Sequence, residues 1–236
     1  MIILANKRKP FFTFVKSILK IFRHKPKIIN ENEILEDGAI YLSNHSAASG
    51  PLIYELYFPK ETRFWGTYEM CEGYRSQWKY LSKIYYPNKK HLPKWLSKIV
   101  ATIVLPFIHG FYKGIDILPT YPDARLFKTI KRSFIELDNN KSIMIFPENS
   151  SDGYHDILTE YFAGFLVLAK LYYKKTGKNL TIYNMYYYRK KNTIIIKKAT
   201  SYLELINSGL SDKEIANKLK KEANQIFEEK FKKESK

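Results

Sequence analysis

Short apolar runs alternate along the chain with longer segments in which apolar residues recur at helical spacing. The apolar runs predict strands at residues 39–43, 62–66, 114–118, 142–146, 180–188 and 193–197. The amphipathic segments predict helices at residues 51–58, 68–86, within 91–111, and at 123–137, 157–174 and 211–231. Strands that alternate with helices form a largely parallel sheet covered by helices on both faces. We therefore predict an α/β fold with a mostly parallel sheet flanked by helices, as one domain at residues 28–236 that includes a C-terminal helix.

Two of these helices carry a more specific signal. Ser211 and Glu214 match a capping box, in which each side chain bonds the backbone of the other residue at a helix start. The helix at 123–137 is predicted to bury one apolar stripe, made of Leu126, Ile130, Phe134 and Leu137.

The first 27 residues form a basic amphipathic segment ahead of this domain. Residues 11–23 predict a helix in which Lys16, Lys20 and Arg23 lie off the apolar stripe. The stripe consists of Phe11, Phe14, Val15, Ile18, Leu19 and Phe22. Such a helix can lie on an anionic bilayer or pack against its own domain, and periodicity does not separate the two. Residues 28–38 are predicted to be a polar connector.

Polar residues follow two of the buried strands. Asn44 and His45 come directly after the strand at 39–43, and Glu148 follows the strand at 142–146. The carboxyl ends of parallel strands share one edge of a sheet, where ligands bind. A neutral imidazole at that edge can act as a general base. Taken singly, the stretch at His45 favours an ordinary histidine hydrogen-bonded in a turn, and Glu148 can equally be a loop carboxylate in water.

Together these residues resemble the glycerolipid acyltransferase family, whose best-known members are 1-acylglycerol-3-phosphate acyltransferases. Asn44-His45 matches the start of the family's N-H-x-x-x-x-D motif, and Phe146-Pro147-Glu148 matches the start of F-P-E-G-T-R. Residues 114–118, 162–164 and 180–186 lie where further family motifs belong. The resemblance covers residues 39–201. It implies a glycerol-phosphate-acyltransferase-like fold and a place in phospholipid biosynthesis.

The resemblance also implies a reaction and its partners. An acyl chain moves from a thioester, on coenzyme A or acyl carrier protein, to a hydroxyl of a lipid or glycerol-phosphate-like acceptor, with no cofactor or metal. His45 and Asn44 are then the catalytic candidates. The substrate-binding candidates are Glu148, Ser150, Ser151, Gly50, Arg125 and Lys128. We expect a cytoplasmic protein that is peripheral on the inner face of the cell membrane and contacts its anionic surface.

The sequence departs from the family pattern at several motif positions. Gly50 replaces the aspartate that orients the histidine, so Glu148, another acid of residues 152–160 or a backbone carbonyl must replace it. Ser151 replaces the arginine of the glutamate motif, and Asn149 replaces its glycine. The second-motif arginine falls near residues 119–120, and the usual proline of the last strand is Asn184. Arg125 and Lys128 are candidates to bind the acceptor's phosphate instead. A catalytically silent relative that binds lipid or an acyl carrier is the alternative.

Charge and composition exclude few classes of function. The formal net charge of +17 favours anionic partners, although a lysine-rich proteome would give the same excess. Cys71, the single cysteine, permits no disulfide within the chain and no cysteine-based metal site. The opening residues do not match a secretory signal, and no run is apolar for about 18 residues, as a spanning helix requires. We therefore expect any membrane contact to be interfacial.

Three further functions compete with acyl transfer. Residues 186–191 join three tyrosines to three basic residues, as in single-stranded nucleic-acid binding proteins. We favour a strand followed by a basic turn, because no recognised nucleic-acid motif is present. A serine hydrolase lacks its G-x-S-x-G elbow. His91, His109 and His155 have no metal-ligand spacing, so no metal is predicted.

Overall fold

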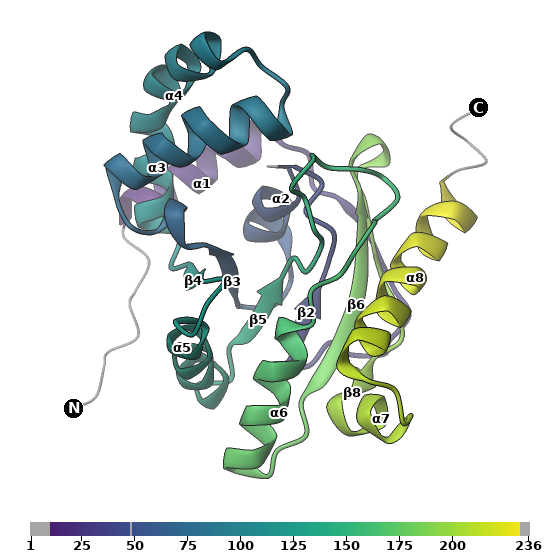
Figure 1. The fold of residues 1–236 in the computed structure, drawn as a ribbon. Coiled ribbons are helices and arrows are strands. Elements are labelled where there is room, and N and C mark those ends of the chain that lie inside the picture. The colour runs from purple at the N-terminus through teal and green to yellow at the C-terminus, as the bar shows by residue number, and fades with distance from the viewer. Residues whose placement is uncertain (1–9, 48, 232–236) are drawn as a thin grey trace.

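The computed structural model describes residues 10–47 and 49–231 (Figure 1). The expectations placed on the opening residues and on the tail at 232–236 therefore lie outside the described residues, as does the side chain of Phe11. Within the described part, the chain forms a mixed, mostly parallel sheet flanked by helices, which confirms the α/β prediction. The acyltransferase-like variant of that fold stays a prediction.

The sheet has the strand order β1-β7-β6-β2-β5-β3-β4, and β8 pairs with β6. β6 runs antiparallel to β7 and β8, and the other pairs are parallel. The strands are β1 (Lys27–Asn30), β2 (Ile40–Leu42), β3 (Thr62–Thr67), β4 (Leu118–Thr120), β5 (Ser142–Ile145), β6 (Thr181–Tyr188), β7 (Thr193–Ile196) and β8 (Thr200–Ser201). β2 and β5 are adjacent and central, so the residues that follow them meet at one edge of the sheet.

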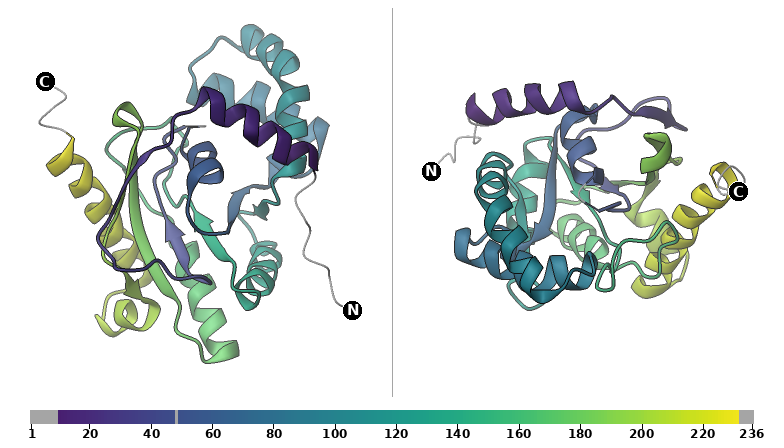
Figure 2. Two further views of the ribbon diagram at one scale, coloured as in Figure 1. Left: turned by 180° about the vertical axis from the view of Figure 1, so that it is seen from behind. Right: turned by 90° about the horizontal axis from the view of Figure 1, so that it is seen from above.

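Helices cover both faces of the sheet (Figures 1 and 2). They are α1 (Pro10–Phe22), α2 (Ser49–Tyr57), α3 (Tyr74–Tyr80), α4 (Lys94–Gly114), α5 (Leu126–Asp138), α6 (Gly164–Thr176), α7 (Tyr202–Asn207) and α8 (Asp212–Lys230). A π-helical segment, η2 (Leu81–Lys89), continues α3, and short 3₁₀ turns form η1 (Tyr68–Met70) and η3 (Arg189–Lys191). The capping box at Ser211 and Glu214 is present at the start of α8, as predicted.

The alternation of side chains along the strands divides the core into two layers. Ile40 and Leu42 of β2 face the cluster built with α5, α6, α7 and α8. Tyr41 between them faces the opposite cluster, which includes Ile53 and Tyr54 of α2. A third cluster joins η2 to the inner face of α4. The predicted stripe of α5 is buried in the first cluster, with Ile130 and Leu137 at most 3% exposed.

Several predicted boundaries are wrong. The supposed connector at 28–38 contains β1, an edge strand without period-two burial that pairs only with β7 among the described strands. The strand expected at 114–118 is displaced, because α4 continues to Gly114 and β4 begins at Leu118. The helix expected at 68–86 is divided among η1, α3 and η2.

The helix expected at 157–174 begins only at Gly164, because tertiary contacts hold the preceding residues in extended form. The Asn224 side chain donates to the Leu158 carbonyl and accepts from its N–H. Tyr161 forms an isolated bridge with Glu148. Apolar spacing at 157–163 therefore reflects buried loop residues rather than a helical turn.

Candidate active site

The end of β2 is fixed between its two parallel neighbours before it delivers His45. The Ser43 N–H donates to the Ile145 carbonyl, 3.1 Å away. The Asn44 amide donates to the Tyr187 carbonyl at 3.0 Å and accepts from the Tyr187 N–H at 2.7 Å. The Asn44 side chain is thus used in holding the loop to β6, and it positions the histidine that follows.

The turn after His45 orients its imidazole. Ser46 and Ala47 have φ values of 44° and 57°. These lie in the left-handed region of the backbone, which residues other than glycine, asparagine and aspartate rarely adopt. This turn brings the Ala47 carbonyl 2.5 Å from Nδ1 of His45. Because a carbonyl only accepts hydrogen bonds, Nδ1 must carry the proton in the neutral ring. Nε2 then holds the free lone pair, as a general base requires.

Gly50 lies where α2 approaches that turn most closely. A Cβ at this position would overlap the carbonyl oxygen of His45. The motif position that carries aspartate in the resembled family is therefore closed to any side chain here. Orientation of the imidazole passes instead to the Ala47 carbonyl, one of the replacements considered from the sequence.

Glu148 reaches His45 from the neighbouring strand β5. Its Oε1 accepts a hydrogen bond from the His45 backbone N–H at 2.9 Å, which joins residues 103 positions apart. Burial raises the pKa of Glu148 to about 7, although the His45 N–H and nearby Lys89 act in the opposite direction. The carboxyl group is 8% exposed, so its ionised form is poorly solvated.

Aromatic side chains enclose the imidazole. The Tyr154 ring stacks on His45 with centroids 4.9 Å apart, and Phe146 meets it edge-on at 5.1 Å. Burial above all, together with the positive charge of Lys89, lowers the pKa of His45 to about 4, although the hydrogen bond to the Ala47 carbonyl acts in the opposite direction. His45 is therefore neutral at physiological pH.

Lys89 is a site residue that sequence reasoning missed. It ends the π-helical segment η2, and its Nζ donates to Ser150 Oγ at 2.8 Å. The same ammonium lies 5.2 Å from the centre of the Tyr154 ring. Burial lowers the pKa of Lys89, while Glu148 raises it. No motif marks this residue, and a lysine followed directly by Lys90 offers no signal that distinguishes it from a surface lysine.

The other predicted substrate-binding residues lie in different surroundings. Ser150 contacts Lys89, whereas Ser151 is exposed and its N–H bonds the Asn149 side chain. Arg125 is held by Asp123, at 2.8 Å, and lies beside the stacked rings of Tyr68 and Tyr121. Lys128 is exposed on the first turn of α5.

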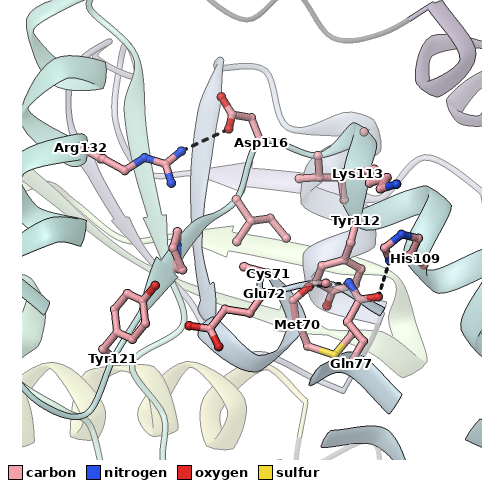
Figure 3. A pocket seen from close by; sticks show the side chains of 15 residues that line it. Met70, Cys71, Glu72, Gln77, His109, Tyr112, Lys113, Asp116, Tyr121 and Arg132 are labelled. Atoms are coloured by element: carbon pink, nitrogen blue, oxygen red, sulfur yellow. Dashed lines mark hydrogen bonds and ion pairs between the residues drawn. The ribbon is translucent and has the colours of Figure 1, made fainter. Parts of the chain in front are cut away.

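A cavity of about 360 Å³ lies beside α4, and neither His45 nor Glu148 lines it. Figure 3 shows Arg132 paired with Asp116 at one wall and His109 bonded to Gln77 at another. Its lining mixes apolar side chains with the charged residues Lys113, Asp116 and Arg132, and such charges do not suit an acyl chain. We therefore place the candidate chemistry at His45 rather than at this cavity.

The tyrosine–lysine run at 186–191 offers no surface on which bases could stack. Tyr186, Tyr187 and Tyr188 are at most 3% exposed, because they belong to β6 within the core. Only the basic residues of η3 are exposed. This arrangement is the strand followed by a basic turn that the sequence favoured.

Comparisons with known proteins leave the chain without an assigned family. No protein-family model matches it, and no curated protein is significantly similar to it.

Proposed function

We propose that this protein is an acyltransferase that moves an acyl chain from a thioester donor to a hydroxyl of a lipid acceptor at the membrane surface. The observation that carries this proposal is the hydrogen bond from the His45 backbone N–H to the Glu148 carboxylate, which places both residues at one site. Two motif residues that are remote in the sequence share one sheet edge, where α/β proteins bind ligands. The donor is an acyl-coenzyme A or an acyl carrier protein.

In the proposed reaction, Nε2 of His45 removes the proton from the acceptor hydroxyl while the oxygen attacks the thioester carbonyl. The tetrahedral intermediate then expels the thiolate. The thiolate takes from His45 the proton that came from the acceptor hydroxyl, and it leaves as a thiol. The Ala47 carbonyl holds the required tautomer throughout, in the role that an orienting carboxylate has in other histidine sites.

Lys89 is the group best suited to stabilise the negative charge that develops on the thioester oxygen. Its ammonium is partly buried and fixed by Ser150, and a fixed charge in a poorly solvated site stabilises an oxyanion strongly. Lys89 also disfavours protonation of His45, which keeps the base neutral before substrate binds.

The surroundings of Arg125, a candidate to bind the acceptor's phosphate, indicate the acceptor class. Arg125 is already bonded to Asp123, so a bidentate arginine clamp for a phosphate is not ready-made there. This favours a hydroxylated lipid, such as a glycolipid or an amino lipid, over a glycerol phosphate.

Mass-spectrometric detection of the acylated product tests the proposal. The assay offers acyl-coenzyme A or acyl carrier protein together with lysophosphatidic acid, a glycolipid or an amino lipid. We expect His45→Ala to abolish transfer and His155→Ala, an exposed histidine of the loop after β5, to retain it. Equal product from His45→Ala and the parent would refute the proposed base.

A catalytically silent relative is the second candidate, and one observation favours it. The Ala47 carbonyl carries no formal charge, so it stabilises an imidazolium less than a carboxylate would. Binding of an acyl thioester without turnover, under conditions in which every acceptor is offered, would establish this alternative.

A further inference from the structure

Helices α1 and α4 expose an unusual number of large apolar side chains. Along α4 these residues recur every four positions and are 48–81% exposed, and those of α1 are 39–75% exposed. We name this set the α1–α4 face; it comprises Trp95, Ile99, Ile103 and Phe107 of α4 and Phe14, Ile18, Ile21 and Phe22 of α1. Single exposed apolar residues are normal, but eight on two adjoining helices indicate an interaction surface.

The two helices are held together at one end of the molecule. The Phe12 ring packs 5.5 Å from that of Phe111, and it lies so close to Gly114 that a Cβ there would overlap it. Figures 1 and 2 show α1 and α4 at the same end as the loop that follows β5. Both helices therefore lie at the end of the molecule where the loop after β5 leaves the sheet.

Charge favours an anionic bilayer over a protein partner. Neither α1 nor α4 contains an acidic residue, whereas α4 carries Lys94, Lys98 and Lys113, and α1 carries Lys20 near its end. Long lysine side chains reach lipid phosphates while apolar neighbours enter the acyl region, and tryptophan prefers this boundary. A second copy of the face would instead set lysine against lysine.

Packing indicates that α4 lies along the bilayer surface rather than across it. By length and composition α4 could span a membrane, and only 17% of its most apolar stretch is buried. Its opposite side is nevertheless attached to the protein, since Ser97, Ala101 and Leu105 are fully buried against η2 and its neighbours. A helix attached in this way can immerse one face only.

We propose that the α1–α4 face docks this protein onto an anionic lipid bilayer, with the exposed side chains of α4 as its main apolar contact. The proposal goes beyond the acyl-transfer reaction, because docking requires neither donor nor turnover. Vesicle binding can therefore succeed while acyl transfer fails, or the reverse, and the two outcomes remain distinguishable.

Co-sedimentation with vesicles tests the docking surface. The probes are vesicles of phosphatidylcholine alone and of phosphatidylcholine with phosphatidylglycerol in equal parts. The test variant combines Ile99→Gln, Ile103→Gln and Phe107→Gln. The matched control places glutamine at exposed apolar residues elsewhere, namely Ile34, Phe127 and Ile135. Far-ultraviolet circular dichroism verifies that both variants fold.

We expect the full-length protein to bind the mixed vesicles more tightly than phosphatidylcholine vesicles. The α4 variant should lose roughly 100-fold in partition coefficient, since three large side chains no longer leave water, and the control should change by less than about 3-fold. Brominated lipid should quench the parent's fluorescence more than that of Trp95→Phe.

Three results would overturn the proposal. These are an absence of vesicle binding, equal binding by the parent and the α4 variant, and a parent dimer that the α4 substitutions dissociate without any vesicle binding. The last result would assign the face to self-association instead.

Discussion

Replacing Glu148 by glutamine should make the protein more stable above neutral pH. The carboxyl group is buried against the His45 backbone, and its pKa rises from 4.5 to about 7. At about 1.4 kcal/mol for each tenfold change, this difference is a penalty of about 3 kcal/mol on the ionised native state. Glutamine keeps the acceptor oxygen for the His45 N–H and carries no charge.

The sign of the change in stability with pH follows from the difference in proton binding between the native and unfolded states. Between pH 4.5 and about 7 the native state holds the Glu148 proton while the unfolded chain releases it, so the parent's stability falls as pH rises. Glu148→Gln removes this slope. We expect the variant to match the parent within about 1 kcal/mol at pH 5 and to exceed it by about 2–3 kcal/mol at pH 8.5.

Urea denaturation followed by tryptophan fluorescence, at both pH values, measures the difference. Glu160→Gln is the matched control, because that carboxylate belongs to the same loop but is exposed. A gain of equal size at pH 5 and pH 8.5, or lower stability at both, would refute the burial argument. Loss of acyl transfer together with the gain in stability would indicate a charge kept for function at the expense of folding.

The stability contribution of His45 changes with pH in the opposite direction to that of Glu148. Burial lowers its pKa from 6.5 to about 4, so the parent loses stability as pH falls through that interval. His45→Gln should therefore gain about 2–3 kcal/mol relative to the parent near pH 4 and nothing from this source at pH 8. The same denaturation series measures it, and a gain confined to high pH would contradict the assigned environment.

Three further substitutions examine the turn and the ammonium. Gly50→Ala should destabilise the protein by about 3 kcal/mol or more in urea denaturation, because its Cβ meets backbone, whereas Gly110→Ala meets no atom within 4 Å and serves as control. Asn44→Ala should cost about 3 kcal/mol by leaving two buried Tyr187 backbone groups unpaired, and an unchanged urea midpoint would contradict this. Lys89→Met should lower acyl-transfer kcat about 100-fold without a matching rise in KM, and Lys89→Arg should restore part of it; a change in KM alone would exclude the proposed oxyanion role.

The sequence predicted the layered α/β architecture because burial imposes a pattern on it. The run Ile143–Ile145 is apolar on both faces of the sheet, and the capping box at Ser211 uses two residues three positions apart. β1 was not predicted, because an exposed edge strand carries no regular pattern of buried residues. The extended segment before α6 was misread because its backbone partners come from Asn224 in a distant helix.

The candidate site divides in the same way. His45 and Glu148 could be found because each follows a buried strand and belongs to a motif. The turn at Ala47 could not, since nothing in a run of small residues specifies two left-handed conformations. Lys89 could not either, because its place beside Ser150 depends on how η2 packs. Apolar spacing predicted a helix within 91–111 but not which of its sides faces solvent.

Under the proposed function, the Ala47 carbonyl takes the place of the orienting carboxylate of the resembled family, and this changes what the site can stabilise. The Ala47 carbonyl fixes the ring and its tautomer, but its partial charge offsets little of a full positive charge on the imidazole. Burial and Lys89 both oppose that charge as well. A free imidazolium is therefore unfavourable, and proton removal has to coincide with development of negative charge on the acyl group. Lys89 would stabilise that negative charge, so the cation that weakens the base before the reaction supports it at the transition state. Under the proposed function, Gly50 at the aspartate position and the partly buried Lys89 belong to one arrangement, in which the reacting substrate supplies the counter-charge for His45.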